Sequence, residues 1–531
     1  MKNSIINPNS IFGLSDKEKD LFIRFGYGGK ASPSHFLIHK AFEDQVKISP
    51  NRIAVEHLGE SISYKNLDLK ANLLAKYLMK IGVKENENVG LFVERSIPMI
   101  IGLLAILKAG AAYVPQDARI APTDQLSFIS EIADTKVILT LSHLMHRIPL
   151  KGDKVGLSID TLINDLDDDR DVHLDTNNVV TNKNCFILFT SGTTGNPNGV
   201  QVTHRNVCNL LLTSPGNLGI KHTDKVSQIL NISFDMSAWE ILGTLSQGAT
   251  LVIRGKDIEE TIRKVNVVIA TPSILASVNA NKCNGVRVAA VAGEPCPKPL
   301  AEKWSSFCRF YNNCGPTEVT IVNTIKEYIS SEQGSITIGR PTPNNTVYIL
   351  NEKYEPCNIG EVGEMWAGGD CVSNGYIKNL RLTSERYKDD PFIGNGKKMF
   401  RTRDLARWTK NGELEHFGRT DDQVKIRGFR VELDSISNVL EQVDSSSQAV
   451  TLKLNSRDLV SFVTPDNVNI EQCKQEIAEK LPYYCMPKQI YSLSRLPRTN
   501  RGKIDKRALI IKAVQLIEER ENVTNEQSIG A

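Results

Sequence analysis

The apolar run Cys185-Phe186-Ile187-Leu188-Phe189 leads through Thr190 into Ser191-Gly192-Thr193-Thr194-Gly195, and this stretch decides the fold. The run has the length and residue types of a buried β-strand. The residues after it are small, hydroxylated and glycine-rich, so they can turn sharply and present backbone N–H groups to an anion. No Gly-Lys-Ser/Thr of the common P-loop follows, and an ordinary surface loop can have a similar composition. The stretch indicates a phosphate-binding loop, provided that the rest of the chain supports it.

The bulk composition is that of a globular enzyme with more than one domain. The chain has 531 residues, of which 40% are hydrophobic and 24% charged, and it is too long for one core. A net charge of +3 does not indicate a nucleic-acid partner. The ten cysteines form no CxxC pair and no cluster with histidine, which argues against disulfides and structural zinc and fits a reducing cytoplasm. The longest apolar run, Ile97 to Leu107, is short of the roughly 20 residues that span a bilayer, so we expect no membrane role.

The order of apolar patterns predicts an α/β fold. A helix is expected over Tyr64–Ile81, a strand over Asn88–Val93 and a buried helix over Ile97–Ala109. Beyond about Lys397 the charges crowd together, and a smaller α+β unit with its own strands and helices follows. We therefore expect a large N-terminal domain of mixed and parallel sheets flanked by helices, hinged to a small mobile C-terminal domain. The expected divisions are a leader or linker over 1–35, a core over 36–420, a C-terminal unit over 421–520 and a frayed tail over 521–531.

Seven motifs occur in a fixed order, and together they are far more specific than any one alone. They are 107–115 (LKAGAAYVP), 189–195 (FTSGTTG), 234–237 (FDMS), 315–318 (GPTE), 418–421 (GRTD), 425–428 (KIRG) and 500–503 (NRGK). With them the chain resembles the adenylate-forming enzymes, specifically the amino-acid adenylation domains of nonribosomal peptide synthetases. The resemblance runs from about Phe42 to Lys506.

The resemblance implies a reaction in which a carboxylate attacks the α-phosphate of ATP, giving an acyl-adenylate and pyrophosphate. Both reactants are anions, and two unit charges near 4 Å repel by about 4 kcal/mol at an effective dielectric of ~20. Lys503 is implied as the cation that bridges carboxylate and phosphate. Glu318 is implied as the ligand of Mg²⁺, a cation that favours carboxylate and phosphate oxygens. Arg419 is a second cation expected near the nucleotide.

The same resemblance supplies an ATP-binding set. The loop from Thr190 to Gly195 should hold the β- and γ-phosphates. Asp404 should accept hydrogen bonds from the ribose hydroxyls, the alternative being an ordinary ion pair with Arg403 or Arg407. The full set is Thr190, Ser191, Gly192, Thr193, Thr194, Gly195, Asn312, Asn313, Cys314, Thr317 and Asp404.

Asp235 distinguishes amino-acid activators, where this acid pairs with the substrate α-ammonium, from activators of fatty or aryl acids. Such a charge-assisted pair contributes about 1.5–3 kcal/mol. Three alanines imply a roomy pocket and Trp239 an aromatic wall, which favours Phe, Trp or Tyr over Leu, although such residues also simply pack cores. Asn313 can hydrogen-bond a polar tip. The implied pocket comprises Asp235, Met236, Trp239, Ala270, Ala290, Ala292, Asn313, Ile321, Val322 and Lys503.

A second half-reaction, transfer to the phosphopantetheine thiol of a carrier protein, is also implied. Asp421 is then the hinge, and Gly428 lines the thiol tunnel, where a side chain would block the arm. Because no carrier motif follows in this sequence, we expect a free-standing or excised domain that meets its carrier in trans, with a small activating partner protein as a further expectation.

Three positions depart from the family pattern. Asn198 replaces a lysine, Cys314 replaces a tyrosine that stacks on adenine, and Arg403 replaces a glycine. Loss of the aromatic stack alone costs on the order of 1 kcal/mol. Two alternatives therefore stay open: an acyl- or aryl-CoA ligase, which Asp235 argues against, and a degenerate ATP-binding protein without turnover.

Overall fold

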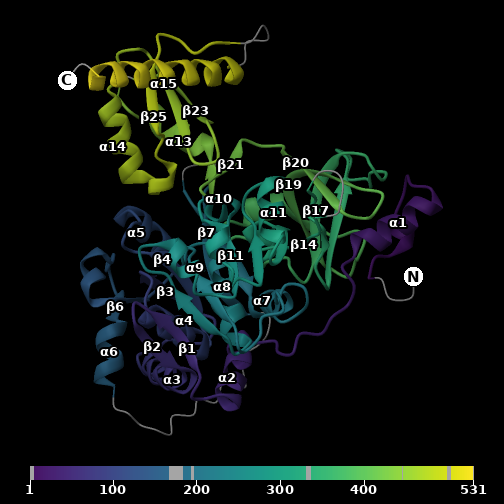
Figure 1. Cartoon of the computed structure of the whole chain (residues 1–531), viewed down its shortest axis with the longest axis vertical. Coiled ribbons are helices and arrows are strands. Elements are labelled where there is room, and N and C mark those ends of the chain that lie inside the picture. The colour runs from purple at the N-terminus through teal and green to yellow at the C-terminus, as the bar shows by residue number, and fades with distance from the viewer. Residues whose placement is uncertain are drawn as a thin grey trace. The chain divides into compact units, whose positions relative to one another are not determined.

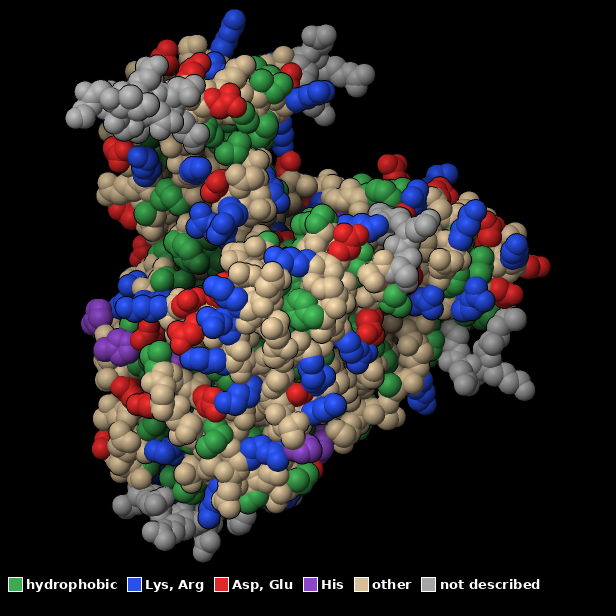
Figure 2. All heavy atoms as spheres, viewed as in Figure 1, with side chains coloured by type: hydrophobic (Ala, Val, Ile, Leu, Met, Phe, Trp, Pro, Cys, Tyr) green, Lys and Arg blue, Asp and Glu red, His purple; other side chains and the backbone are tan. Residues whose placement is uncertain are grey.

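The computed structural model describes residues 5–166, 183–192, 196–330, 336–444, 446–498 and 504–529. The chain divides into two compact units, and Figure 1 shows their elements. The first comprises 1–119, 126–190 and 198–421, and the second comprises 120–125, 191–197 and 422–531. On the face seen in Figure 2, basic and acidic side chains are interspersed. None of the helices among the described residues combines the length and apolarity that crossing a membrane requires.

The largest sheet of the first unit is mostly parallel. Its order is β15 (Arg340–Pro341), β14 (Thr324–Tyr328), β13 (Arg309–Cys314), β12 (Val288–Val291), β11 (Val267–Ala270), β9 (Lys225–Gln228), β10 (Thr250–Ile253), β1 (Ile53–His57) and β2 (Glu60–Ser63). The strands from β13 to β1 run parallel, whereas β14, β15 and β2 pair antiparallel at the two edges. The inner strands are short apolar runs that are buried along their whole length, as expected for a covered parallel sheet.

A second sheet carries the strand with which the sequence analysis began. Its order is β6 (Val155–Ser158), β5 (Val137–Thr140), β3 (Asn88–Val93), β4 (Ala112–Asp117), β7 (Asn184–Thr190) and β8 (Asn198–Thr203), with β8 antiparallel to β7. The predicted strand over β3 is confirmed, and β7 extends the expected apolar run by one residue at each end.

Helices accompany both sheets. Among the described residues from 27 to 421 they are α2 (Ile38–Ile48), α3 (Tyr64–Lys80), α4 (Ile97–Lys108), α5 (Thr123–Ile132), α6 (Ile159–Asp165), α7 (His204–Leu211), α8 (Asp235–Ser246), α9 (Ile258–Ile262), α10 (Pro272–Ala276), α11 (Lys298–Ser305) and α12 (Leu380–Arg386). The predicted helices over α3 and α4 are confirmed. Ser96 is the N-cap residue of helix α4, and its hydroxyl accepts a hydrogen bond from the Met99 N–H. The helix is buried on all sides and packs on α3 (Figure 1).

The third sheet of the first unit is antiparallel and is covered by the start of the chain. Its strands are β16 (Asn345–Leu350), β17 (Gly363–Gly369), β18 (Tyr387–Asp389), β19 (Lys398–Trp408) and β20 (Leu414–Arg419). Helix α1 (Asp16–Gly26) lies beside this sheet (Figure 1), and its Phe22 and Ile23 join a core with Tyr348 and Trp366. Within the segment expected as a leader or linker, helix α1 is therefore packed onto the sheet, because its apolar side chains are buried against residues such as Tyr348 that are distant in the sequence.

The second unit begins with a hairpin of β21 (Gln423–Ile426) and β22 (Phe429–Glu432). Its two turn residues, Arg427 and Gly428, have φ values of 51° and 83°, the left-handed pair of a type I′ turn. The hairpin is followed by α13 (Leu433–Glu441), β23 (Gln448–Lys453), β24 (Leu459–Thr464), α14 (Ile470–Lys480), β25 (Gln489–Ser492) and α15 (Lys506–Ile529). The expected frayed tail is instead part of α15, whose Leu509 and Ala513 pack against β24.

Two buried histidines face each other where α2 meets α7. The rings of His39 and His204 lie edge to face with their centroids 5.5 Å apart. Burial lowers the pKa of His204 to about 4, and burial together with the charges of His204 and Lys108 holds the pKa of His39 well below its ordinary value. Among the described residues, neither ring nitrogen of His39 has a hydrogen-bond partner. Both rings are therefore neutral in the fold at physiological pH.

These histidines predict a loss of stability in mild acid. The unfolded chain binds protons near pH 6.5 and the folded chain only near pH 4, so the free energy of unfolding falls as the pH drops through this window, by up to about 3 kcal/mol for His204. Urea unfolding at pH 7 and pH 5 measures this loss. His39→Phe should reduce it and His222→Gln, on an exposed histidine, should not. An unchanged loss in His39→Phe would contradict the assignment.

Candidate functional site

Asp235 and Thr317, which are 82 residues apart, meet in the first unit. Asp235 is the first residue of α8 and is 6% exposed. The Thr317 hydroxyl donates a 2.8 Å hydrogen bond to its Oδ2. Thr317 itself lies in a short 3₁₀ turn, Thr317–Val319, immediately after β13. The FDMS and GPTE motifs thus form one buried polar contact.

Close backbone approaches bring further predicted pocket residues together. A Cβ at Gly315 would lie 2.5 Å from the Val322 Cα, so only glycine permits this contact. A Cβ at Gly293 would lie 3.8 Å from the Met236 sulfur, which places Met236 beside the turn after Ala292. The approach at Gly315 brings the GPTE segment against the buried Ile321–Val322 turn.

The register of the large sheet sorts the remaining wall residues by face. Ala290 pairs with Tyr311, so Asn313, two residues further along β13, shares that face. Ala270 pairs with Val291, whereas Ile269 pairs with Ala290, so Ile269 rather than Ala270 has its side chain on the face of Ala290. The side chains of Ala270 and Ala290 therefore lie on opposite faces of the sheet.

Trp239 and Asn313 are buried polar side chains that differ in how completely their polar atoms are hydrogen-bonded. The Trp239 indole N–H donates a 2.8 Å hydrogen bond to the Gly216 carbonyl. The Asn313 amide donates to the Val291 carbonyl at 2.9 Å. Within the described part of the chain, Asn313 Oδ1 is buried without a hydrogen-bond partner. A ligand with an N–H or O–H group could satisfy this oxygen, which is costly to leave unpaired.

Glu318 is fully buried and held by a residue that the sequence did not single out. The Tyr376 hydroxyl donates a 2.6 Å hydrogen bond to Glu318 Oε1, and the Ser373 N–H bonds the Glu318 carbonyl. The only sequence signal for Tyr376 is its place after Gly375. No group of three His, Cys, Asp or Glu side chains arranged to hold a metal occurs among the described residues. A cation at Glu318 would therefore depend on ligand oxygens, as Mg²⁺ does in nucleotide sites.

Asp404 belongs to a partly buried charge network that includes Arg419 and His416. Arg419 donates to Asp404 Oδ1 at 2.8 Å and to Asp421 Oδ1 at 2.7 Å. Burial by itself would raise the pKa of Asp421, but the hydrogen bonds and charge of Arg419, with the charge of Arg403, lower it below its ordinary range. Arg419 thus connects a predicted ribose ligand to the predicted hinge.

Arg403 has a backbone conformation that explains the glycine expected there. Its φ is 64°, in the left-handed region that favours glycine, beside an irregularity in the β19–β20 pairing. Its guanidinium contacts Glu385 at 2.8 Å and Asp421 at 3.4 Å. These ion pairs offset part of the backbone strain.

The other residues predicted to bind the nucleotide make separate contacts in the structure. Thr190 ends β7, and its hydroxyl lies 3.4 Å from the Asn198 carbonyl, with Ser191 and Gly192 following directly. Asn312, on the face of β13 opposite Asn313, donates to the Thr337 carbonyl. Cys314 packs against the core of the antiparallel sheet. Thr193, Thr194, Gly195 and Lys503 lie outside the described residues.

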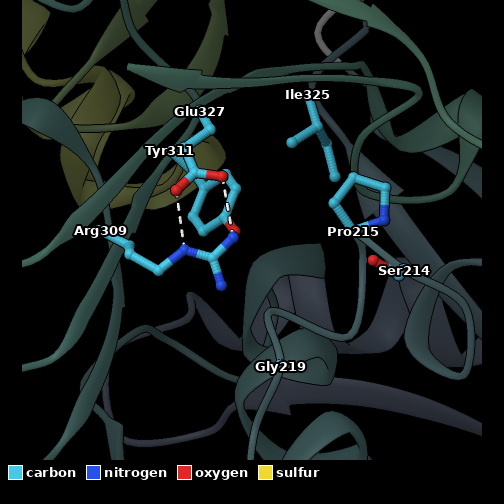
Figure 3. Close-up of a pocket in the computed structure, with 7 residues that line it drawn as sticks. All are labelled: Ser214, Pro215, Gly219, Arg309, Tyr311, Ile325 and Glu327. Atoms are coloured by element: carbon cyan, nitrogen blue, oxygen red, sulfur yellow. Dashed lines mark hydrogen bonds and ion pairs between the residues drawn. The ribbon is translucent and has the colours of Figure 1, made fainter. Parts of the chain in front are cut away.

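A separate cavity of about 330 Å³ lies on the Asn313 face of β13 and β14 (Figure 3). Arg309 and Glu327 form a two-bond ion pair on one side, at 2.7 and 2.8 Å, beside the Tyr311 ring. Pro215 and Ile325 form the apolar side opposite (Figure 3). The sequence did not indicate this cavity, and its two charged side chains are paired with each other.

Removing the Arg419 charge tests the network around Asp404. Arg419, Asp404 and Asp421 side chains are 15%, 9% and 17% exposed, so Arg419→Gln leaves two poorly solvated carboxylates without their shared cation. We expect the free energy of unfolding to fall by about 3–5 kcal/mol, measured by urea denaturation at pH 7. The matched control is Arg407→Gln, which breaks a more exposed pair with Glu415 and should cost less than about 1 kcal/mol. Equal losses would contradict the network.

The comparisons agree with this geometry. The model of the family "AMP-binding enzyme" matches residues 42–377. Adenylate-forming reductase 03009 of Coprinopsis cinerea is 42% identical over 510 residues, 95% of this chain and 49% of that protein. Gramicidin S synthase 1 of Brevibacillus brevis is 33% identical over 529 residues, 96% of this chain and 47% of that protein. The chain thus spans about half the length of these two relatives.

Solved structures show the same fold. A four-domain nonribosomal peptide synthetase bound to AMP and glycine has a TM-score of 0.66 and 28% identity, covering 93% of this chain and 38% of that one. An artificially fused adenylation–PCP di-domain from Klebsiella oxytoca has a TM-score of 0.77 at 24% identity, covering 86% of this chain and 93% of that one. The α/β fold class is confirmed. The chain belongs to the AMP-binding family of adenylate-forming enzymes, which use ATP.

Proposed function

We propose that this chain activates an α-amino acid as an aminoacyl-AMP, with release of pyrophosphate. The observation that carries the proposal is the buried Asp235 carboxylate, fixed by Thr317 of the GPTE segment. A carboxylate at 6% exposure requires charged or hydrogen-bonded compensation. A substrate ammonium would supply a positive charge, with the substrate carboxylate then directed toward the nucleotide. A fatty or aryl acid would leave Asp235 without this partner.

The substrate class follows from the pocket walls. Trp239 offers an aromatic surface that its bond to Gly216 holds in place. The unpaired Asn313 oxygen favours a side chain with an N–H or O–H donor. We therefore propose a large aromatic amino acid, with Trp and Tyr before Phe, and Phe before Leu.

For the nucleotide, the proposal assigns the ribose hydroxyls to Asp404 and the phosphates to the loop after β7. Glu318, oriented by Tyr376, would hold Mg²⁺ together with phosphate oxygens. The cation would neutralise developing charge on the triphosphate. Arg419 would orient the Asp404 carboxylate through its hydrogen bond.

The adenylate would pass to the phosphopantetheine thiol of a carrier protein. Support comes from the relatives named as gramicidin synthases and from the adenylation–PCP neighbours. Asp421 is proposed as the hinge, because the first compact unit ends at this residue. Gly428 is proposed to line the thiol path, and its positive φ independently favours glycine. A cytoplasmic location and a small activating partner also belong to the proposal.

A second candidate fate is reduction of the activated carboxyl group. It rests on the identity to two proteins named adenylate-forming reductases, 42% and 43%, against 31–35% for the synthetases. The adenylation step is the same in both cases, so the two fates differ only in what consumes the thioester.

ATP–pyrophosphate exchange tests the proposal, with Trp, Tyr, Phe and Leu each paired with its analogue lacking the amino group. Wild type should exchange with the aromatic amino acids and not with the analogues. Asp235→Asn should raise KM for the amino acid by about 10- to 100-fold, because a charge-assisted contact is lost, while KM for ATP stays within about twofold. Equal exchange with amino acids and des-amino analogues would overturn it.

Lys503 carries a separate prediction that follows from the family resemblance. Lys503→Ala should abolish pyrophosphate exchange, because the charge bridging the two anions is gone. It should spare thioester formation from a supplied aminoacyl-adenylate and a carrier protein. Lys506→Ala, on the neighbouring helix, serves as the control. Equal loss of both half-reactions in Lys503→Ala would refute the assigned role.

A further inference from the structure

Glu240 is a fully buried carboxyl group on α8, five residues after Asp235. Its Oε1 accepts the Ile229 N–H at 2.7 Å, and its Oε2 accepts the Leu230 N–H at 3.1 Å. The Gln228 side-chain amide approaches Oε2 at 3.3 Å. Glu240 therefore bonds both backbone N–H groups at the point where the chain leaves β9.

The segment that Glu240 hydrogen-bonds is the one that leads to Asp235. Residues 229–234 connect β9 to α8, so the Glu240 contacts join the start of this connection to the helix beyond its end. Arg95 donates to the Ile229 carbonyl at 3.0 Å, which fixes the opposite edge of the same peptide. Gln228 donates to the Leu230 carbonyl at 2.7 Å. The first two residues of the connection are thus held on both their N–H and C=O sides.

The rest of the connection is held by local bonds. Asn231 accepts from the Ser233 N–H at 3.0 Å, and its carbonyl accepts the Phe234 N–H at 2.9 Å. The Asn231 side-chain amide donates to Asp117 at 2.9 Å. The connection 229–234 is thus held at its start by Glu240 and in its middle by Asn231. The Asp235 side chain that follows it is held by the Thr317 hydroxyl.

The chemistry of this contact requires a carboxylate-like pair of acceptors. A glutamine would keep one oxygen and present an N–H group to the second backbone N–H, which replaces attraction by repulsion. Burial raises the pKa of Glu240 to about 8, against the opposing effect of the Ile229 and Leu230 N–H groups. With or without its proton, the carboxyl group has two oxygens that can accept hydrogen bonds, and both are used here.

We propose that Glu240 is a positioning residue that sets the place of the Asp235 carboxylate for the substrate ammonium. The inference rests on the proposed function, since it acts through Asp235. It predicts an effect confined to the amino-acid side of the site, because the backbone groups that Glu240 bonds, those of Ile229 and Leu230, begin the connection that leads to Asp235.

The test is amino-acid-dependent ATP–pyrophosphate exchange with wild type, Glu240→Gln, Glu240→Asp and Asp224→Asn. The last is the matched control: Asp224 is a buried acid at the opposite end of β9, ion-paired with Arg287. Glu240→Gln should raise KM for the amino acid by about tenfold or more and change KM for ATP less than about twofold. Glu240→Asp, which keeps both oxygens, should give an intermediate KM. Asp224→Asn should lower stability without separating the two KM values.

A double variant separates positioning from general stability. In an Asp235→Asn background, Glu240→Gln should add less than about twofold to the amino-acid KM, because the group it positions is already gone. Full additivity, or an equal rise in both KM values, would overturn the inference while leaving the proposed function intact. If Glu240→Gln does not fold, the same two comparisons are made with Glu240→Asp. A wild type that shows no exchange with any amino acid would overturn the proposed function and this inference with it.

Discussion

The hydrogen bond from Thr317 to Asp235 joins the segments that follow two strands of the large sheet, β13 and β9, which are separated in the sheet by β12 and β11. Asp235 begins the helix after β9, and Thr317 follows β13. A carboxylate so well buried restricts what can surround it, since its charge must be compensated by donors or by a bound cation. The GPTE segment supplies one such donor, and the proposed substrate ammonium would supply a positive charge. The Asp235 carboxylate is therefore both the proposed partner of the substrate amine and the group that contacts the GPTE segment.

The nucleotide side of the site follows the same principle of shared charges. Arg419 serves two carboxylates, Asp404 and Asp421, and so lowers the cost of burying both. Asp421, the last residue of the first compact unit, is the proposed hinge. Arg419 therefore links this hinge residue to Asp404, which is proposed to bind the ribose. Arg403 reaches the same Asp421 from a left-handed backbone position.

Much of the fold could be predicted from local pattern. Helices α3 and α4 and strand β3 have strong apolar periodicity or continuous apolar runs, and their bounds agree with expectation to within one residue. Helix α1 was not predicted from the sequence. Its first turns are charged, and its Phe22 and Ile23 are buried by the antiparallel sheet, which is distant in the sequence. Helix α15 extends through a polar segment that the sequence suggested as a frayed tail.

The site shows the same division between local and long-range information. The motifs predicted Asp235, Thr317, Glu318 and Asp404 as functional residues, yet they gave no sign that Thr317 bonds Asp235 or that Tyr376 bonds Glu318. These contacts join residues 58 to 82 positions apart. The placement of Ala270 and Ala290 on opposite faces of the sheet arises from strand register, which motif spacing does not fix. Glu240 was likewise invisible as a positioning residue, because its partners are backbone groups.

The most direct measurement is a crystal structure of the chain with a non-hydrolysable aromatic aminoacyl-adenylate analogue. The account predicts the ligand ammonium within hydrogen-bonding distance, about 3 Å, of the Asp235 carboxylate, with the ribose hydroxyls at Asp404. A ligand bound with its amino group away from Asp235 would contradict it.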